Sequence, residues 1–181
     1  MHKSKEKIID FLDNFDLDKI PAAVVLEAKR AVLDTLGCMV AGIDTPLGEG
    51  VHKLAHRFID KKGVTVFGLK KKITPFMAAM CNSYMANAYD ADDGHRRSRL
   101  HAGGIIIPVA LAVAQENNNT GKQFLEAIII GFELGYRAGM VTTTWETYHG
   151  SAMGSTFGAA AAAGKLMGLS SEQIINAMGI A

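Results

Sequence analysis

Twelve consecutive residues, Asp90 to His101, concentrate groups that can move protons and bind anions. They read Asp-Ala-Asp-Asp-Gly-His-Arg-Arg-Ser-Arg-Leu-His and so supply three carboxylates, two imidazoles and three guanidinium groups. Such a set can provide a general base, a general acid and cationic groups for a carboxylate substrate. The simpler interpretation is a solvated charged loop, and apolar helical patterns on both sides of the segment make that the less favoured one.

The aspartates are candidates for proton transfer. Two carboxylates that lie close together raise the pKa of one of them, which makes it a usable acid. Alternatively, Asp92 and Asp93 are turn residues before Gly94. We assign the catalytic role to Asp90 and place Asp93, Gly94 and His95 among the candidate substrate-binding residues.

The arginines are candidates for carboxylate recognition. Arg96, Arg97 and Arg99 could hold a di- or tricarboxylate by bidentate hydrogen bonds, while at least one of them pairs with a neighbouring aspartate. We take Arg96 and Arg97 as substrate-binding candidates.

Two histidines are candidate catalytic residues. His101 precedes Ala102-Gly103-Gly104, and its neutral form near pH 7 could remove a proton alpha to a carboxylate. His149 precedes an expected helix start at Ser151, where free backbone N–H groups favour an anion. From the residues alone, His101 could equally be an exposed loop histidine, and for His149 a position near a helix cap is the better interpretation.

A metal or cofactor is not expected. The aspartates before Gly94 superficially resemble a calcium loop, but the spacing fails, and His101 stands where the pattern needs a glutamate. Only two cysteines, Cys38 and Cys81, are present, too few for an iron–sulfur cluster, and apolar surroundings predict that both are buried thiols.

Composition excludes several classes of protein. With 181 residues, 49% hydrophobic and 20% charged residues, the chain can bury a core, and disorder is not expected. A formal net charge of +1 gives no reason to expect nucleic acid or an anionic membrane as partner. The N-terminus lacks a secretory signal, and charged residues interrupt the apolar segment 121–140, so a cytoplasmic protein without a membrane span is expected.

Apolar periodicity predicts a single all-helical domain over residues 1–181. The expected helices lie at 4–17, 21–42, 45–59, from 74 towards Asp90, 104–117, 120–140, 151–167 and from 170 onward. Thr120 with Gln123 and Ser170 with Gln173 predict capping boxes. Residues 64–67 predict one short strand.

Three helices carry further expectations. The helix from 74 should be buried on several faces, because apolar residues cover a wide arc. In the helix 120–140, Glu133 and Arg137 should pair on the face opposite the apolar one. The helix 151–167 contains 158–164, a run of Gly and Ala that should let a neighbouring helix approach closely.

The order of short motifs resembles the MmgE/PrpD family, which includes 2-methylcitrate dehydratase, cis-aconitate decarboxylase and iminodisuccinate epimerase. The resemblance covers essentially the whole chain. Its matching pieces are Leu33-Asp34-Thr35-Leu36-Gly37, Ala78-Ala79-Met80-Cys81-Asn82, Asp90-Ala91-Asp92-Asp93-Gly94-His95, His101-Ala102-Gly103, Ile107-Pro108-Val109-Ala110-Leu111-Ala112, Gly131-Phe132-Glu133, His149-Gly150-Ser151 and Gly158-Ala159-Ala160-Ala161-Ala162.

The resemblance implies a fold and a site. The family has an all-helical domain plus a smaller α+β domain, so this chain would be only the N-terminal part of the helical domain, without an active-site lysine and tyrosine that come from later regions. The family's active-site aspartate and histidines match Asp90, His101 and His149. Gly94 replaces a threonine, Ala102 a proline, and Tyr148 and Gly150-Ser151 flank His149, departures that bear on substrate identity.

Two hypotheses follow. The first is a cofactor-independent lyase or epimerase, with a homodimer or other homo-oligomer as assembly, that acts on a small polycarboxylate by proton transfer alpha to a carboxylate, with loss of water or CO2. The second is a catalytically incomplete fragment, or one subunit of a split enzyme completed by a C-terminal subunit. The last helix runs apolar to Ala181 without a cap, which favours the second.

Overall fold

The computed structural model describes residues 2–142 and 149–181. Within them the chain is all-α, as predicted. The eight helices are α1 (His2–Asn14), α2 (Ala22–Gly42), α3 (Pro46–Ala55), α4 (Pro75–Ala86), α5 (Gly103–Asn117), α6 (Gly121–Val141), α7 (Gly150–Leu166) and α8 (Ser171–Ile180). Two short 3-10 turns, η1 (Leu17–Lys19) and η2 (His56–Phe58), and one strand, β1 (Ile59–Val64), complete the elements.

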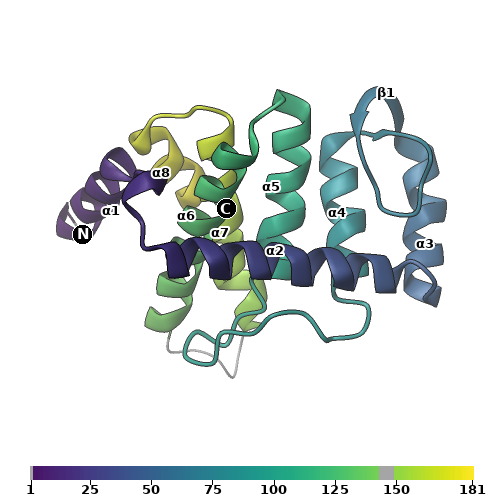
Figure 1. The fold of residues 1–181 in the computed structure, drawn as a ribbon, viewed down its shortest axis with the longest axis horizontal. Helices are drawn as coiled ribbons and strands as arrows, with labels where there is room; N and C mark the ends of the chain where they lie inside the picture. The colour runs from purple at the N-terminus through teal and green to yellow at the C-terminus, as the bar shows by residue number, and fades with distance from the viewer. Residues whose placement is uncertain (1, 143–148) are drawn as a thin grey trace.

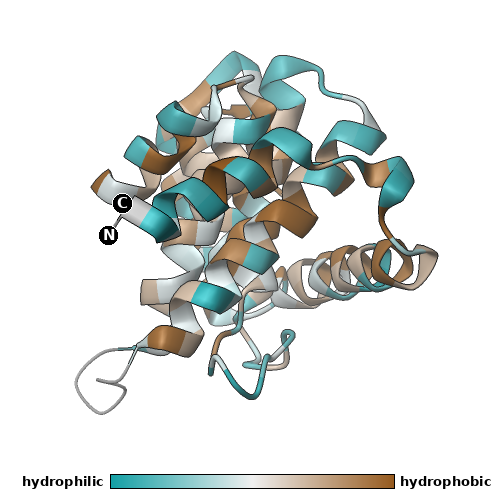
Figure 2. Ribbon diagram, turned by 90° about the vertical axis from the view of Figure 1, so that its left-hand side faces the viewer, coloured by the Kyte–Doolittle hydropathy of each residue, from teal (hydrophilic) through white to brown (hydrophobic). Residues whose placement is uncertain are grey.

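Helix α2 lies across the neighbouring helices α4, α5 and α6 (Figure 1). Helix α3 and β1 stand at one end of the molecule, and α1 and α8 pack together at the other. The turned view in Figure 2 shows hydrophobic and hydrophilic residues mixed along each helix, as expected of helices that bury one face. None of the described helices has the length and apolarity needed to cross a bilayer.

Among the described helices, α6 and α7 make the most extensive contact, and they meet through glycines. A Cβ atom added at Gly158 would collide with the carbonyl oxygen of Gly131, and one added at Gly135 would lie 3.1 Å from the carbonyl oxygen of Gly154. Backbone therefore packs against backbone here, and the prediction that the small residues permit close approach is confirmed. Ile106 of α5 closes the third side of this contact.

Local signals set several helix ends as expected. Both capping boxes form, with the Thr120 and Ser170 hydroxyls accepting from the backbone N–H groups three residues later. The predicted pair on α6 also forms, with Arg137 Nε donating to Glu133 Oε1 at 2.5 Å. The first and third helices end earlier than predicted, at Asn14 and Ala55, because 3-10 turns follow them.

The strand predicted at 64–67 was misplaced, since β1 ends at Val64. Val64 and Val66 are core residues, and their alternation reflects an extended connector instead of a paired strand. Side-chain amides make the backbone hydrogen bonds that a neighbouring strand would otherwise make. Gln115 Oε1 accepts from Thr65 N at 3.0 Å, and Asn82 accepts from Phe67 N at 3.1 Å and donates to Thr65 O at 3.0 Å.

Helix α4 is buried on one side only, which corrects the expectation of burial on several faces. Met77, Cys81 and Met85 are buried, whereas Phe76 is 79% and Tyr84 49% exposed. The apolar arc is wider than the buried face of the helix, so its outer part remains exposed in this chain. Of the two thiols predicted to be buried, Cys81 is buried as predicted, whereas Cys38 is only half-buried.

The glycine contact predicts a sharp difference between two Gly→Ala substitutions. Gly158→Ala should lower the free energy of unfolding by roughly 1–3 kcal/mol or more, because the added methyl group forces α6 and α7 apart. Gly37→Ala, in the exposed middle of α2 with no atom within 4 Å of the added Cβ, should raise it by about 0.5–1 kcal/mol. Urea unfolding of both variants measures this, and equal effects would contradict the proposed backbone contact.

Candidate active site

The charged segment lies in a connector, residues 87–102, that joins α4 to α5 along one edge of the molecule (Figure 1). Leu100 anchors it, being 1% exposed and lying against Gly139 of α6 and Gly154 of α7. A tight turn precedes the anchor, in which His95 N donates to Leu100 O at 2.9 Å and Arg99 N to His95 O at 2.8 Å. Core packing thus fixes where the connector enters α5.

A cavity of about 450 Å³ opens beside this connector. Its walls come from α4, from the connector, and from the first turns of α5 and α7. The lining residues are Met80, Ser83, Tyr84, Asn87, Asp90, Asp92, His101, Gly104, Ile105, His149, Ser151 and Ala152. All three predicted catalytic residues, Asp90, His101 and His149, are therefore on one cavity, although they come from distant parts of the sequence.

Asp92 and His101 bring a carboxylate and an imidazole together in the cavity. His101 Nδ1 lies 3.6 Å from Asp92 Oδ1, and the Asp92 side chain is 1% exposed. Asn87 Nδ2, at the end of α4, donates to the same carboxylate oxygen at 3.1 Å. Asp90 is exposed and takes a left-handed backbone conformation, with φ of 51°, that Asp tolerates better than most residues.

The start of α7 faces the cavity. Ser151 Oγ accepts a hydrogen bond from His101 N at 3.0 Å, which ties the start of α5 to the first turn of α7. No side chain caps α7 at His149, and its first turn holds no acidic residue. The backbone N–H groups of a helix's first turn favour an anion, so this wall of the cavity suits an anionic group.

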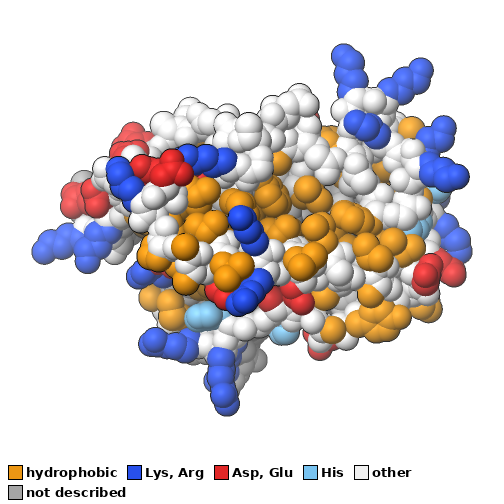
Figure 3. Space-filling model, in the orientation of Figure 1, with side chains coloured by type: hydrophobic (Ala, Val, Ile, Leu, Met, Phe, Trp, Pro, Cys, Tyr) orange, Lys and Arg blue, Asp and Glu red, His pale blue; other side chains and the backbone are white. Residues whose placement is uncertain are grey.

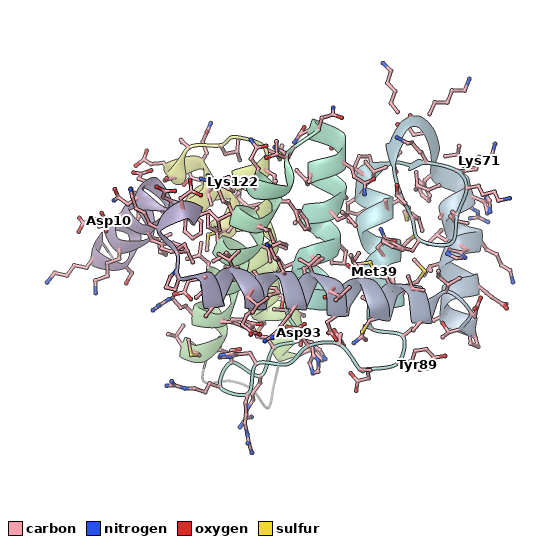
Figure 4. All side chains as sticks on the ribbon, viewed as in Figure 1. Asp10, Met39, Lys71, Tyr89, Asp93 and Lys122 are labelled. Carbon is pink, nitrogen blue, oxygen red and sulfur yellow. The ribbon has the colours of Figure 1, made fainter. Side chains whose placement is uncertain are left out.

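Asp93 points the opposite way from Asp92. Its Oδ1 accepts from Gly103 N at 2.6 Å and its Oδ2 from Tyr136 Oη at 3.1 Å. Burial raises the pKa of the Asp93 carboxyl, and these two hydrogen bonds only partly offset that effect. Burial raises the pKa of Tyr136 as well, and the Asp93 charge raises it further. Figure 4 shows Asp93 between α2 and the connector.

The remaining predicted substrate-binding residues do not line the 450 Å³ cavity. His95 stacks on the Tyr136 ring, with centroids 4.3 Å apart, and its Nδ1 lies 2.7 Å from Ser98 Oγ. Gly94 lines a second hollow together with Asp93 and Tyr136. Arg96 and Arg97 are exposed on the connector. Tyr148, expected to flank the site, lies outside the described residues.

Three cavity residues offer metal-ligating atoms. One atom each from Asp90, Asp92 and His101 lie within 4.8 Å of one another, a spacing that a cation could bridge. Asp90 and Asp92 are close in the sequence, and the fold of the connector brings His101 next to them. The same carboxylates and imidazole can also bind and transfer protons without a metal ion.

Sequence reasoning did not single out Asn87, Ser151 or Tyr136 as site residues. Asn87 and Ser151 carry a weak signal, because Asn87 is a polar residue near a predicted helix end beside the charged segment and Ser151 is a polar residue at the predicted helix start after His149. Tyr136 carries none, since it occupies an ordinary apolar position on the α6 face. Its hydroxyl group donates a hydrogen bond to Asp93 because α6 packs against the connector.

The chain is similar to known proteins of one family. Residues 6–181 match the model of the MmgE/PrpD N-terminal domain. The chain is 32% identical over 184 residues to a cis-aconitate decarboxylase of Aspergillus terreus, a match that covers 97% of this chain and 38% of that protein. It is 31% identical over 176 residues to the cis-aconitate decarboxylase-like protein oryM of Aspergillus oryzae, covering 90% of this chain and 36% of that protein.

A cis-aconitate decarboxylase of Homo sapiens is more distant, at 29% identity over 167 residues, covering 87% of this chain and 34% of that protein. The chain therefore spans little more than a third of the length of the curated relatives it matches.

Burial of Asp93 predicts a pH-dependent contribution to stability. A carboxyl whose pKa is raised by folding destabilises the folded chain above the raised pKa, and this cost disappears as the pH falls towards the unfolded value of 3.8. Wild-type protein should therefore gain stability relative to Asp93→Asn as the pH falls from 7 towards 4. Urea unfolding at several pH values measures the difference.

The control for this experiment is Asp44→Asn, which removes an exposed carboxyl group outside the connector. Its difference from wild type should change less over the same pH range. A wild-type-minus-Asp93→Asn difference that stays flat, or that falls with decreasing pH, would contradict the effect of burial on Asp93.

Proposed function

Because the chain belongs to the MmgE/PrpD family, we propose that it carries the acid–base residues of a cofactor-independent lyase acting on a small polycarboxylate. The observation that carries the proposal is the convergence of Asp90, Asp92, His101 and His149 on one cavity. A buried carboxylate beside an imidazole is an arrangement suited to proton transfer near neutral pH.

The proposed chemistry uses His101 as the group that moves the proton. In a decarboxylation, the bond between a carboxylate and its carbon breaks, CO2 leaves, and the electron pair that stays on carbon takes a proton from protonated His101. In a dehydration, neutral His101 removes a proton alpha to a carboxylate, and the hydroxyl group leaves as water once an acid protonates it. Asp90 assists as the second proton-transfer group.

We favour decarboxylation of cis-aconitate as the reaction, because the relatives from Aspergillus terreus and Homo sapiens are cis-aconitate decarboxylases. Dehydration of 2-methylcitrate and the epimerase branch of the family are the alternatives. The cavity supports a carboxylate-bearing substrate in each case, since His149 and the uncapped start of α7 both line it.

The charges that line the cavity indicate that a polycarboxylate substrate needs cationic groups from outside it. Two aspartates line it, and its described lining residues include no lysine or arginine. A substrate with two or three carboxylates therefore needs cations from elsewhere. Arg96 and Arg97 on the same connector are candidates, as are groups from a second polypeptide.

A second candidate function is one subunit of a split enzyme, or a catalytically incomplete fragment. Large apolar side chains are exposed on this chain, among them Leu33 at 72%, Phe76 at 79% and Tyr89 at 63%. Hydrophobic side chains gather over the α2 face of the molecule (Figure 3). Uncovered surface of this kind favours a partner, either a second copy or a complementary C-terminal polypeptide.

Turnover in a completed enzyme tests the first function. The 181-residue chain is co-expressed with the part of the Aspergillus terreus relative that it does not match, and cis-aconitate, 2-methylcitrate and iminodisuccinate are assayed. We expect CO2 release from cis-aconitate only when both polypeptides are present. His101→Gln should lower kcat by about 100-fold or more, because general acid–base catalysis contributes that much.

The matched control is His56→Gln, which removes an exposed histidine remote from the cavity and should leave turnover unchanged. Binding to the 181-residue chain alone is followed by NMR, where cis-aconitate should shift the ring signals of His101 and His149. Full turnover in His101→Gln would show that His101 is not the acid–base group. A lack of both binding and turnover for all three acids would reject the lyase.

Exposed apolar surface predicts self-association. Sedimentation velocity of the 181-residue chain should show dimers or larger species whose population rises with concentration. Leu33→Lys, which places a charge in the exposed α2 face, should shift the distribution towards monomer without loss of helicity. A strictly monomeric wild-type chain that stays in solution at high concentration would contradict the proposed partner surface.

A further inference from the structure

One ring nitrogen in the cavity lacks a partner. His101 Nδ1 is buried yet makes no hydrogen bond to any described residue, although the His101 side chain as a whole is 43% exposed. A buried polar nitrogen without a partner is destabilising, so native structures rarely leave one in place. The nearest carboxylate oxygen is Asp92 Oδ1, at 3.6 Å.

We propose that Asp92 is the positioning residue of His101. Its carboxylate receives the Nδ1–H of the neutral ring, which selects the tautomer with an unprotonated Nε2. Nε2 is then the nitrogen that exchanges a proton with a substrate in the cavity, as donor from the protonated ring in a decarboxylation and as acceptor on the neutral ring in a dehydration. This inference rests on the proposed function for its catalytic meaning, but the pairing itself is a property of the chain alone.

Burial distinguishes Asp92 from its neighbour Asp90. The Asp92 side chain is 1% exposed, whereas Asp90 is exposed to solvent, which competes for its oxygens. A carboxylate in a buried position is stable only when donors surround it. Asn87 supplies one donor to Asp92 Oδ1, and a protonated His101 Nδ1 supplies a second to the same oxygen, which has lone pairs for both.

The surroundings hold Asp92 in place from several sides. Asn87 is the C-cap of α4, and its backbone N–H donates to Ser83 O at 3.2 Å, so the helix end holds the backbone of the residue whose side-chain amide donates to Asp92. Gly104 has no Cβ, and one added there would lie 2.5 Å from Asp92 Oδ2. On the far side, Asp93 is bonded to Gly103 N, so the two adjacent carboxylates straddle the start of α5.

The present gap is compatible with this role. At 3.6 Å, Nδ1 and Oδ1 are about half an ångström beyond a normal hydrogen bond, and catalytic hydrogen bonds are often long in ligand-free structures. The backbone of His101 is held by Ser151 Oγ, so only the partly exposed ring needs to rotate. Asp92, in contrast, has no free space to move into on its Gly104 side.

The tautomer of His101 tests the inference directly. In the 15N-labelled 181-residue chain, at a pH where the ring is neutral, long-range 1H–15N NMR shows which ring nitrogen carries the proton, and His101→Gln identifies the signals. We expect the Nδ1–H form to exceed the Nε2–H form by about tenfold or more, as a hydrogen bond to a charged group implies. A predominant Nε2–H form in wild type would overturn the inference without any variant.

Two matched variants separate the aspartates. Asp92→Ala should abolish the Nδ1–H preference, and Asp90→Ala should retain it, with the backbone spectrum confirming that both chains fold. An unchanged tautomer in Asp92→Ala, or its loss in Asp90→Ala alone, would overturn the inference. Because no substrate is present, failure here leaves the proposed lyase open. A confirmed tautomer with neither binding nor turnover of any of the three acids would reject the lyase and keep the pairing.

Discussion

The structure depends on backbone contact between α6 and α7. Where Gly131 meets Gly158 and Gly135 meets Gly154, no side chain separates the two helices, and Ile106 of α5 fills the adjoining space. The same two helices present Gly139 and Gly154 to Leu100, the residue that anchors the charged connector. Helix packing therefore determines the position of the candidate site, because a shift of α7 would move Leu100 and, with it, His101.

The adjacent residues Asp92 and Asp93 organise the space around the start of α5. The two carboxylates of these adjacent residues divide the space around the start of α5, because Asp92 packs against Gly104 and Asp93 accepts from Gly103 N. Asp92 lines the cavity with His101, and Asp93 lines the second hollow with Tyr136. Two adjacent glycines, Gly103 and Gly104, make this possible, since a Cβ at either position would strike one of the carboxylates.

Sequence patterns predicted the helices well and the site in part. Capping residues, the small residues of α7 and the Glu133–Arg137 pair are local signals, so they could be read without tertiary information. The gathering of Asp90, His101 and His149 was expected from family resemblance and not from spacing. The roles of Asn87 and Tyr136 depend on contacts between distant segments, and the strand at 64–67 was misplaced because buried alternation looks the same in a connector and in a sheet.

The connector after β1 shows what side-chain amides can do for an unpaired backbone. Asn82 and Gln115 bond the peptide groups of Thr65 and Phe67 that a neighbouring strand would otherwise take. An extended segment rich in β-branched residues, with free peptide groups, is a template for edge-to-edge aggregation. Here the template is already occupied from within the same chain, so two polar residues on helices protect the protein from intermolecular β-pairing at its most strand-like sequence.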